Sequence, residues 1–557
     1  MGRAGAGYTG GMSTPAAAGT EPEAGLSRRR VYVIFVALMA AMFLSALDQS
    51  IVGTALPTIV GDLGAAENEG WIITAYLLAI AIVMPIYGKV GDLVGRRIPF
   101  LMAIALFVVG STGSALSGSF IELITWRSVQ GLGAGGLVIL SQAIIADIVS
   151  ARDRGKFMGP MGAVFGIATV AGPLLGGWFT EGPGWRWCFW TNVPFGILAF
   201  GIAWFTLKLP SQRPSRRFDI GGAVLLAAAT SGIVLLTSWT SLTGSSGYDW
   251  SDPWLLSLTA ATLAALLAFL VVESRVSDPI VPLRLFRSST FAASTAIALV
   301  LGMAMFAALS FLPTFLQMSL GVGATESGLL MLPMTVGLLI STIASGRIIT
   351  RTGRYKIFPI LGMGIATVAL AWLTLITADM SMVLFGTMIF TLGLGLGLVM
   401  QTIVIAAQNS VSPEQVGVAT STNNFLREIG AAVGTSVFST AFTTRLVTTI
   451  AEDTKQLPAS EVPSTFGASS LTPANVADLP ADLRNAVVDA YAQALAPSFW
   501  YLVPLGLIGF IVAFFMREIR LSTRAGMVAR EEDAAVAAES GAGAGAGAGS
   551  GPRRPSR

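Results

Sequence analysis

Histidine is absent from this sequence of 557 residues, and cysteine occurs only once, as Cys188. The lack of histidine removes the usual metal sites, and a single cysteine cannot form an internal disulfide framework. Without a histidine base or a set of metal ligands, no group of residues suggests enzymatic chemistry. No G-x-x-x-x-G-K-[ST] loop is present to hold the phosphates of ATP. We therefore expect a protein that is not an enzyme and that needs neither a metal nor another cofactor.

Charged residues are also scarce, at 12% of the sequence against 53% for hydrophobic residues. Apolar runs of about 20 residues recur from Val31 to Met516, and a water-soluble domain could not bury so many of them. We expect an all-α integral membrane protein. Polar or Gly/Pro-rich breaks divide the runs into about fourteen helices, at residues 31–57, 70–88, 98–117, 119–147, 157–180, 190–209, 219–240, 254–273, 290–318, 327–346, 356–377, 381–408, 420–446 and 497–516.

The basic residues, which give a net charge of +3, form short clusters in alternate connections, beginning with residues 28–30, 89–97 and 152–156. By the positive-inside rule both termini are cytoplasmic, which requires an even number of spans in a multi-pass protein of the cell membrane. The clusters reflect topology and give no reason to expect a nucleic-acid partner. The low-complexity ends, 1–30 and 517–557, are expected to be disordered cytoplasmic tails.

The sequence also repeats itself. "YGKVGDLVGRRI" (87–98) and "SGRIITRTGRYKI" (345–357) share pairs of a glycine and a basic residue, and three more matches follow in order: 55–58 with 311–314, 130–136 with 392–398, and Gly172 with Gly434. We expect two six-helix halves, 31–209 and 290–516, as in secondary transporters. Between them, 210–289 should hold two extra helices and their loops, as peripheral packing. The second half should include an outer loop at 450–496.

Two charged residues lie deep in apolar segments. Asp48 and Arg127 are each about 12–14 Å from the outer end of their helices at ~1.5 Å per residue, so they could form a pair within the first half. An arginine at that depth costs about 3 kcal/mol on insertion scales and needs a polar partner. An apolar site raises the pKa of a carboxyl group and a nearby arginine lowers it, so a change in their separation would load or unload a proton. The alternative is a static structural ion pair.

Two glycine-containing motifs suggest moving parts. In 88–97, glycines allow a tight turn, and Asp92 can meet helix N-termini or arginines when the two halves close on the inside. We assign this conformational latch to Gly88, Asp92, Gly95, Arg96 and Arg97, and the alternative is an ordinary charged turn that fixes topology. In 162–179, a close helix contact and a bend around a proline are expected at Gly172, Pro173 and Gly176.

Other polar residues leave alternatives open. Glu428 could supply a second proton site or recognise a cation, or it could simply be neutralised by the adjacent Arg427. Glu122 and Asp147, near the two ends of one helix, are expected to be solvated rim charges rather than relays. Aromatic, methionine and amide side chains offer an adaptable surface for lipophilic ligands, and we expect substrate contacts at Trp71, Tyr76, Gln130, Met303, Phe306, Met334 and Gln401.

These motifs together resemble those of the major facilitator superfamily, and within it the fourteen-helix drug:proton antiporters of the multidrug efflux type. The resemblance rests on four stretches in the expected order: Leu47-Asp48 to Pro57, Gly88 to Arg97, Arg127 to Gly133, and Gly172-Pro173 to Gly176. The sequence departs from the usual pattern at Ser50, Gly53, Leu93 and Ala168, which concern packing and the strength of the latch.

The resemblance implies the major facilitator fold and alternating access driven by the proton gradient, with Asp48 exchanging a proton and Arg127 helping to relay it. It also favours Trp71 and Tyr76 as substrate contacts. The expected function is proton-coupled export of lipophilic or cationic drugs and related small molecules, by a protein that is a monomer in the lipid bilayer. A dedicated exporter of an endogenous metabolite, antibiotic or lipid remains an alternative, as does a facilitator or importer.

Overall fold

The computed structural model describes residues 27–64, 70–207, 218–243, 248–453, 476 and 479–521. Within these ranges the chain is helical and has no strand. In the described part of the chain, twelve helical segments are long and apolar enough to cross a membrane, three of which consist of two consecutive helices, and one further apolar helix is shorter. The terminal tails expected from the sequence fall almost wholly outside the described residues.

The first half contains α1 (Arg28–Leu63), α2 (Gly70–Val94), α3 (Arg97–Leu116), α4 (Phe120–Ile148), α5 (Arg154–Glu181), α6 (Trp187–Trp190) and α7 (Asn192–Thr206). The extra segment contains α8 (Ile220–Thr237), α9 (Trp239–Thr243) and α10 (Pro253–Arg275). The second half contains α11 (Ser289–Leu320), α12 (Ala324–Leu330), α13 (Leu332–Thr352), α14 (Ile357–Leu373), α15 (Met382–Asn409), α16 (Val416–Asp453), α18 (Ala481–Ser498) and α19 (Leu502–Phe514). Short 3-10 turns lie at Leu283–Arg287, Pro413–Gln415 and Phe499–Tyr501.

Two of the predicted fourteen spans are not among the twelve candidates. They are present as α14, which has only 17 residues, and as α16, whose polar residues lower its hydropathy. The number of spans and the side of each terminus stay predictions.

Several helices extend beyond their predicted ends. The sequence pattern ended the first helix at Pro57, but α1 continues through it to Leu63, where Gly64 adopts a left-handed conformation with φ 64°. Membrane helices tolerate an internal proline because neighbouring groups satisfy the freed carbonyl. Within the segment 450–496, expected to be an outer loop, α16 continues to Asp453 and α18 begins at Ala481.

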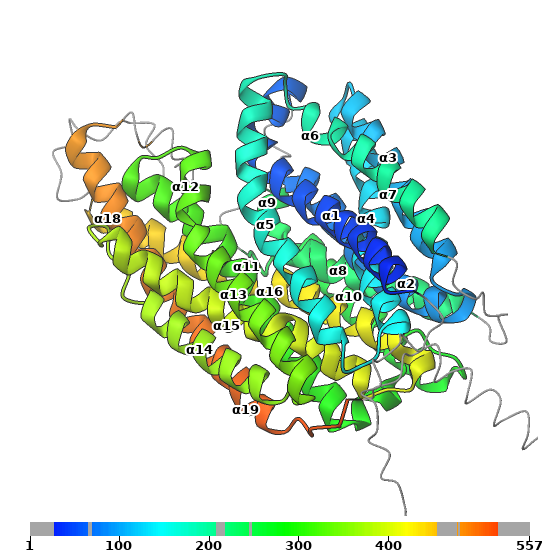
Figure 1. Ribbon diagram of the computed structural model, residues 1–557. Helices are drawn as coiled ribbons and strands as arrows, with labels where there is room; N and C mark the ends of the chain where they lie inside the picture. The colour runs from blue at the N-terminus through cyan, green and yellow to red at the C-terminus, as the bar shows by residue number, and fades with distance from the viewer. Residues whose placement is uncertain are drawn as a thin grey trace, which may run out of the picture.

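The glycines that match in sequence make matching contacts. A methyl group added at Gly131 in α4 would run into α2, and one added at Gly393 in α15 would run into α13. In the same way, Gly172 of α5 lies against α1, and Gly434 of α16 lies against α11. Glycine is needed where two helix backbones approach this closely. The two halves are therefore packed in the same way, and Figure 1 shows them as two bundles side by side, blue to cyan and green to orange.

The extra helices lie where the two halves meet. Helices α8 and α10 pack on one another, and α8 contacts both α2 of the first half and α16 of the second. Beyond the C-terminal end of α8, the hydroxyl groups of Tyr248 and of Ser436, which belongs to α16, are 2.9 Å apart. The two extra helices, α8 and α10, are thus in contact with both halves through α8.

Candidate functional site

Asp48 lies within α1 and its side chain is fully buried. The carboxylate accepts hydrogen bonds from Nη1 of Arg127 at 2.5 Å, Nε2 of Gln130 at 2.8 Å and Nδ2 of Asn192 at 2.7 Å. A carboxylate away from water is stable only when it is paired and hydrogen-bonded in this way. The geometry is therefore that of an ionised Asp48.

Arg127 is held from two sides. Its side chain is 1% exposed, and Nη1 also donates to Oε1 of Gln130 at 2.9 Å. The guanidinium carbon lies 3.9 Å from the ring centre of Tyr76, whose hydroxyl donates to the carbonyl of Ser45 at 3.1 Å. A cation over an aromatic ring is attracted by its negative face, so Tyr76 adds to the binding of the guanidinium. The cluster of Asp48, Arg127, Gln130, Tyr76 and Asn192, here called the carboxylate cluster, joins α1, α2, α4 and α7.

The depth of Asp48 and Arg127 in their helices predicted their pairing, and the structure has them paired. It also places Gln130 and Tyr76, which the sequence assigned to substrate contacts, against these two charges. Asn192 was missed, because a single asparagine at the first position of an apolar helix reads as a helix end. The signal in the sequence is an asparagine at the edge of an apolar segment, because a buried amide needs hydrogen-bond partners. Asn192 is indeed 0% exposed.

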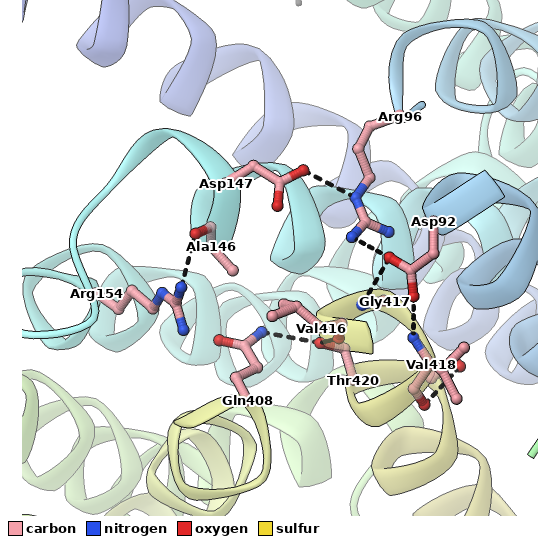
Figure 2. A network of polar contacts seen from close by, with 11 residues as sticks. Asp92, Arg96, Ala146, Asp147, Arg154, Gln408, Val416, Gly417, Val418 and Thr420 are labelled. Carbon is pink, nitrogen blue, oxygen red and sulfur yellow. Dashed lines mark hydrogen bonds and ion pairs between the residues drawn. The ribbon is translucent and has the colours of Figure 1, made fainter. Parts of the chain in front are cut away.

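A second polar network lies at the end of the molecule that carries the Lys/Arg-rich connections, which we call the basic end. The Asp92 carboxylate accepts from the backbone N–H groups of Gly417 and Val418 at 3.0 and 2.8 Å, at the start of α16 (Figure 2). The Arg96 guanidinium donates to Asp92 at 2.5 Å and to Asp147 at 3.0 Å. The free N–H groups and partial positive charge of a helix N-terminus favour a carboxylate there. The first half is thus joined to the second through Asp92.

Arg96 stays charged in this network. Its burial lowers the pKa of the guanidinium, but the carboxylates of Asp92 and Asp147 outweigh that effect and hold the pKa above its usual range. The expectation that Asp147 is a solvated rim charge was wrong: it is 3% exposed and bound to Arg96. Its position near a helix end gave no sign of this partner, because Arg96 lies in the connection between α2 and α3. Glu122, by contrast, lies at the exposed start of α4, where it accepts from the N–H of Gly118 at 2.9 Å.

The remaining residues of the predicted latch have different surroundings. Gly95 has φ 88°, which favours glycine, at the turn between α2 and α3. Gly88 lies so close to α16 that an added methyl group would meet Ser421 and the carbonyl of Gly417. Arg97 instead points to α7, where it donates to the carbonyl of Trp204 at 3.1 Å. The structure does not bring it into the Asp92–Arg96 network.

The glycines around Pro173 face α1. Methyl groups added at Gly172 and Gly176 would meet Ser50 and the Ile51 carbonyl of that helix. Pro173 itself is close to Gly328 of the second half. A methyl group added at Gly328 would lie 3.1 Å from Cβ of Pro173. Further along, a methyl group at Gly346 in α13 would collide with the carbonyl of Gly155 in α5. At Gly155 and Gly346 the backbones of α5 and α13 therefore meet directly and join the two halves.

Glu428 accepts from Arg427 at 3.3 Å, so one expected partner is present. The Arg427 side chain is 3% exposed and that of Glu428 15% exposed. The arginine also faces the first half, because its guanidinium carbon lies 5.7 Å from the ring centre of Phe165 in α5. These contacts fit either alternative, a coupling role or neutralisation, and both stay predictions.

The other predicted substrate contacts are spread over several helix contacts. Met303 of α11 lies against Gly434, and Met334 of α13 lies against Gly393. Gln401 of α15 is 3% exposed and lies against Gly162 of α5, and neither of its amide atoms is hydrogen-bonded to a residue that the structure describes. Phe306 and Trp71 are half-buried in α11 and α2. Their contact with substrate stays a prediction.

No group of three or more His, Cys, Asp or Glu side chains that could hold a metal ion is present among the residues that the structure describes. The fold is that of a helical membrane protein with two repeated halves, and charged side chains such as Asp48 and Arg127 lie in its interior. Such charges mark pathways for substrates and ions. Fold and site together define a membrane transporter.

The chain belongs to the major facilitator superfamily, whose sequence pattern matches residues 38–435. It is 38% identical over 519 residues to an MFS-type transporter of Mycobacterium tuberculosis, covering 92% of this chain and 74% of that one. It is 33% identical over 532 residues to the multidrug transporter protein MdtP of Bacillus subtilis, covering 91% and 97%.

Solved structures share the fold. The human organic anion transporter MFSD10 matches with a TM-score of 0.57 at 15% identity, over 87% of this chain and 99% of that one. A bacterial homologue of the lysosomal transporter Spinster matches with a TM-score of 0.52 at 16% identity, over 88% and 98%. The protein is therefore a multi-pass membrane transporter of the major facilitator fold.

Proposed function

We propose that the protein exports lipophilic or cationic small molecules from the cytoplasm in exchange for protons. The observation that carries this proposal is the carboxylate cluster, in which a fully buried Asp48 is balanced by one arginine and two amides. The relatives support the cargo class, since one is named a multidrug transporter. The basic end is taken as the cytoplasmic side, in accordance with the positive-inside rule.

Coupling follows from the cost of an unpaired buried charge. Removing one partner of a buried ion pair costs about 3–5 kcal/mol. An ionised Asp48 therefore keeps Arg127 in place, whereas a protonated Asp48 lets Arg127 and the helices that carry it rearrange. A gradient that controls the protonation of Asp48 then controls which arrangement is populated.

Alternating access also needs contacts between the halves that can open. Asp92 joins α2 to the N-terminus of α16 at the basic end, and Gly155 of α5 and Gly346 of α13 let the backbones of these two helices meet directly. We propose that this arrangement is the one closed toward the cytoplasm. Separation of α2 from α16 would open it.

The proton gradient is the proposed energy source, with no cofactor, and the proposed working unit is a monomer in the lipid bilayer that acts without a nucleic-acid partner. We propose the domain division 31–209, 210–289 and 290–516, between cytoplasmic tails. A second candidate cargo is a metabolite that the cell itself makes. The chain is 32% identical over 431 residues to a transporter of the acurin A biosynthesis cluster of Aspergillus aculeatus, which covers 76% of each.

The test is proton movement in proteoliposomes of the purified protein, with an imposed pH gradient and a panel of lipophilic dyes. We expect one or more dyes to dissipate the gradient through the wild type and none through Asp48→Asn, which should reach near-normal abundance because asparagine keeps the size of the side chain. Dye-driven proton movement at the wild-type rate through Asp48→Asn would remove Asp48 from the mechanism.

A further inference from the structure

We propose that Asn192 is a positioning residue that sets the proton affinity of Asp48 by turning its amide when the carboxylate gains a proton. This inference rests on the proposed function, because it concerns the same carboxylate. Asn192 is the first residue of α7 and is 0% exposed. Its neighbours in the network are Asp48 of α1 and Ser111 of α3.

The amide is bonded on one side only. Nδ2 donates to Oδ1 of Asp48 at 2.7 Å and to Oγ of Ser111 at 3.1 Å, which uses both of its hydrogens. Oδ1 of Asn192 is buried and has no hydrogen-bond partner among the described residues. Ser111 in turn donates to the carbonyl of Phe189 at 2.9 Å. This orientation fits an ionised Asp48, which can only accept.

Gln130 cannot adapt in the same way. Its Nε2 donates to Asp48, and its Oε1 accepts from Arg127 at 2.9 Å. If the Gln130 amide turned, its N–H groups would face the N–H groups of Arg127. Asn192 has no such constraint, because its Oδ1 is not used.

Protonation of Asp48 changes what the site needs. A proton that binds the Asp48 carboxylate turns one of its oxygens into an O–H donor, yet all the groups bonded to that carboxylate are donors. If the Asn192 amide turns by half a rotation about its Cβ–Cγ bond, Oδ1 comes to the place that Nδ2 occupied. It can then accept from the O–H of Asp48, and from the Ser111 hydroxyl once that hydroxyl turns away from the Phe189 carbonyl. Asn192 can thus bind both forms of Asp48, through Nδ2 when it is ionised and through Oδ1 when it is protonated.

The other titratable groups around Asp48 differ in whether they can accept that proton. Arg127 of α4 is a donor only, whereas Tyr76 of α2 donates its hydroxyl hydrogen to the Ser45 carbonyl and keeps an oxygen that can accept. Cys188 of α6 is buried, and a thiol is a weak acceptor. The amide of Asn192 is the group that can replace a donor by an acceptor at the same place when it turns.

The test is infrared difference spectroscopy of the purified full-length protein in nanodiscs during a pH titration, without any cargo. The carboxylic C=O band of Asp48 is the band present in the wild type and absent in Asp48→Asn. In Asn192→Leu we expect that band to appear at higher pH, by about one pH unit or tenfold in proton affinity, because a hydrogen bond to a charged acceptor is worth more than one to a neutral group. The band should also move to higher frequency, because the acid loses its acceptor.

Two matched variants complete the test. Ser111→Ala keeps the bond from Asn192 to Asp48 and should give a smaller shift in the same direction. Asn423→Leu removes another buried asparagine, whose Nδ2 donates to the Ser294 carbonyl at 3.1 Å, and should leave the Asp48 band unchanged. If Asn192→Leu does not fold, Asn192→Ala, which adds no volume, replaces it.

An unchanged midpoint and frequency in the Asn192 variant would overturn the inference, and so would an equal shift in Asn423→Leu. If instead the wild type shows no Asp48 band at any pH at which it stays folded, the proposed role of Asp48 itself fails, and the inference fails with it.

Discussion

The two halves of the molecule meet at the basic end through two contacts of opposite charge. In the first, the Asp92 carboxylate of α2 caps the N-terminus of α16. In the second, exposed Arg152, between α4 and α5, donates to the carbonyls of Thr350 and Arg351 at the C-terminus of α13, at 3.2 and 3.1 Å. An anion at a helix N-terminus and a cation at a helix C-terminus are both favourable, so each contact uses the charge that suits its helix end.

The sequence repeat shows the same asymmetry. The segment that matches the Asp92 turn has Thr350 where the first copy has the acid, and its side chain donates to its own helix at Gly346. The two contacts also differ in burial: the Asp92 side chain is 6% exposed, and Arg152 is exposed.

The largest effect is expected for Asp92→Asn. Asparagine keeps the size but loses the charge that accepts from two N–H groups and from Arg96. Hydrogen bonds to a charged group contribute about 1.5–3 kcal/mol, so transport that requires the closed basic end should fall about 10–100-fold. Dye export from whole cells at equal protein abundance measures this. Export within twofold of wild type would show that Asp92 does not hold the halves together.

A smaller effect is expected for Gly346→Ala, which tests the contact of α13 with α5. The added methyl group would meet the carbonyl of Gly155, which cannot move without its helix. Overpacking of this kind costs about 1–3 kcal/mol, so we expect a several-fold loss of export that is independent of ionic strength. Gly353→Ala is the control, because Gly353 follows the same helix and has a positive φ but open space around it. Its loss of export therefore measures backbone strain without crowding.

The smallest effect is expected for Arg152→Gln. A charge at an exposed helix end contributes about 0.3–1 kcal/mol, so export should fall less than about fivefold. Surface charges are screened by salt, whereas buried ones are screened much less. The difference between wild type and Arg152→Gln should therefore vanish in proteoliposomes at high salt, while that of Asp92→Asn persists. Equal salt dependence of the two variants would contradict the contrast between the two contacts.

Much of the fold followed from the sequence, because spanning helices need long apolar runs. The repeat was visible as well, since glycines at close helix contacts cannot be replaced freely, and Gly131 and Gly393 mark the same contact in each half. Helix ends were less accessible, because Pro57 reads as a helix end in water but is tolerated in a membrane helix.

At the site, the two charges of the carboxylate cluster stood out because charges are rare in apolar segments. The amides did not, because Gln130 and Asn192 carry no charge and their roles depend on which helices lie beside α1. Asp147 was misjudged for the same reason: its partner Arg96 comes from a different segment, and no local pattern links them.

The central claim is that the protonation of Asp48 controls the closure of the basic end. Spin labels at Ile98 and Glu414, which are exposed on the first and second half, would report that closure by double electron–electron resonance after the single Cys188 is replaced by serine. We expect two distance populations whose ratio changes with pH in otherwise wild-type protein and does not change with pH when Asp48→Asn is added. A ratio that responds to pH equally with and without the Asp48 carboxyl group would contradict the account.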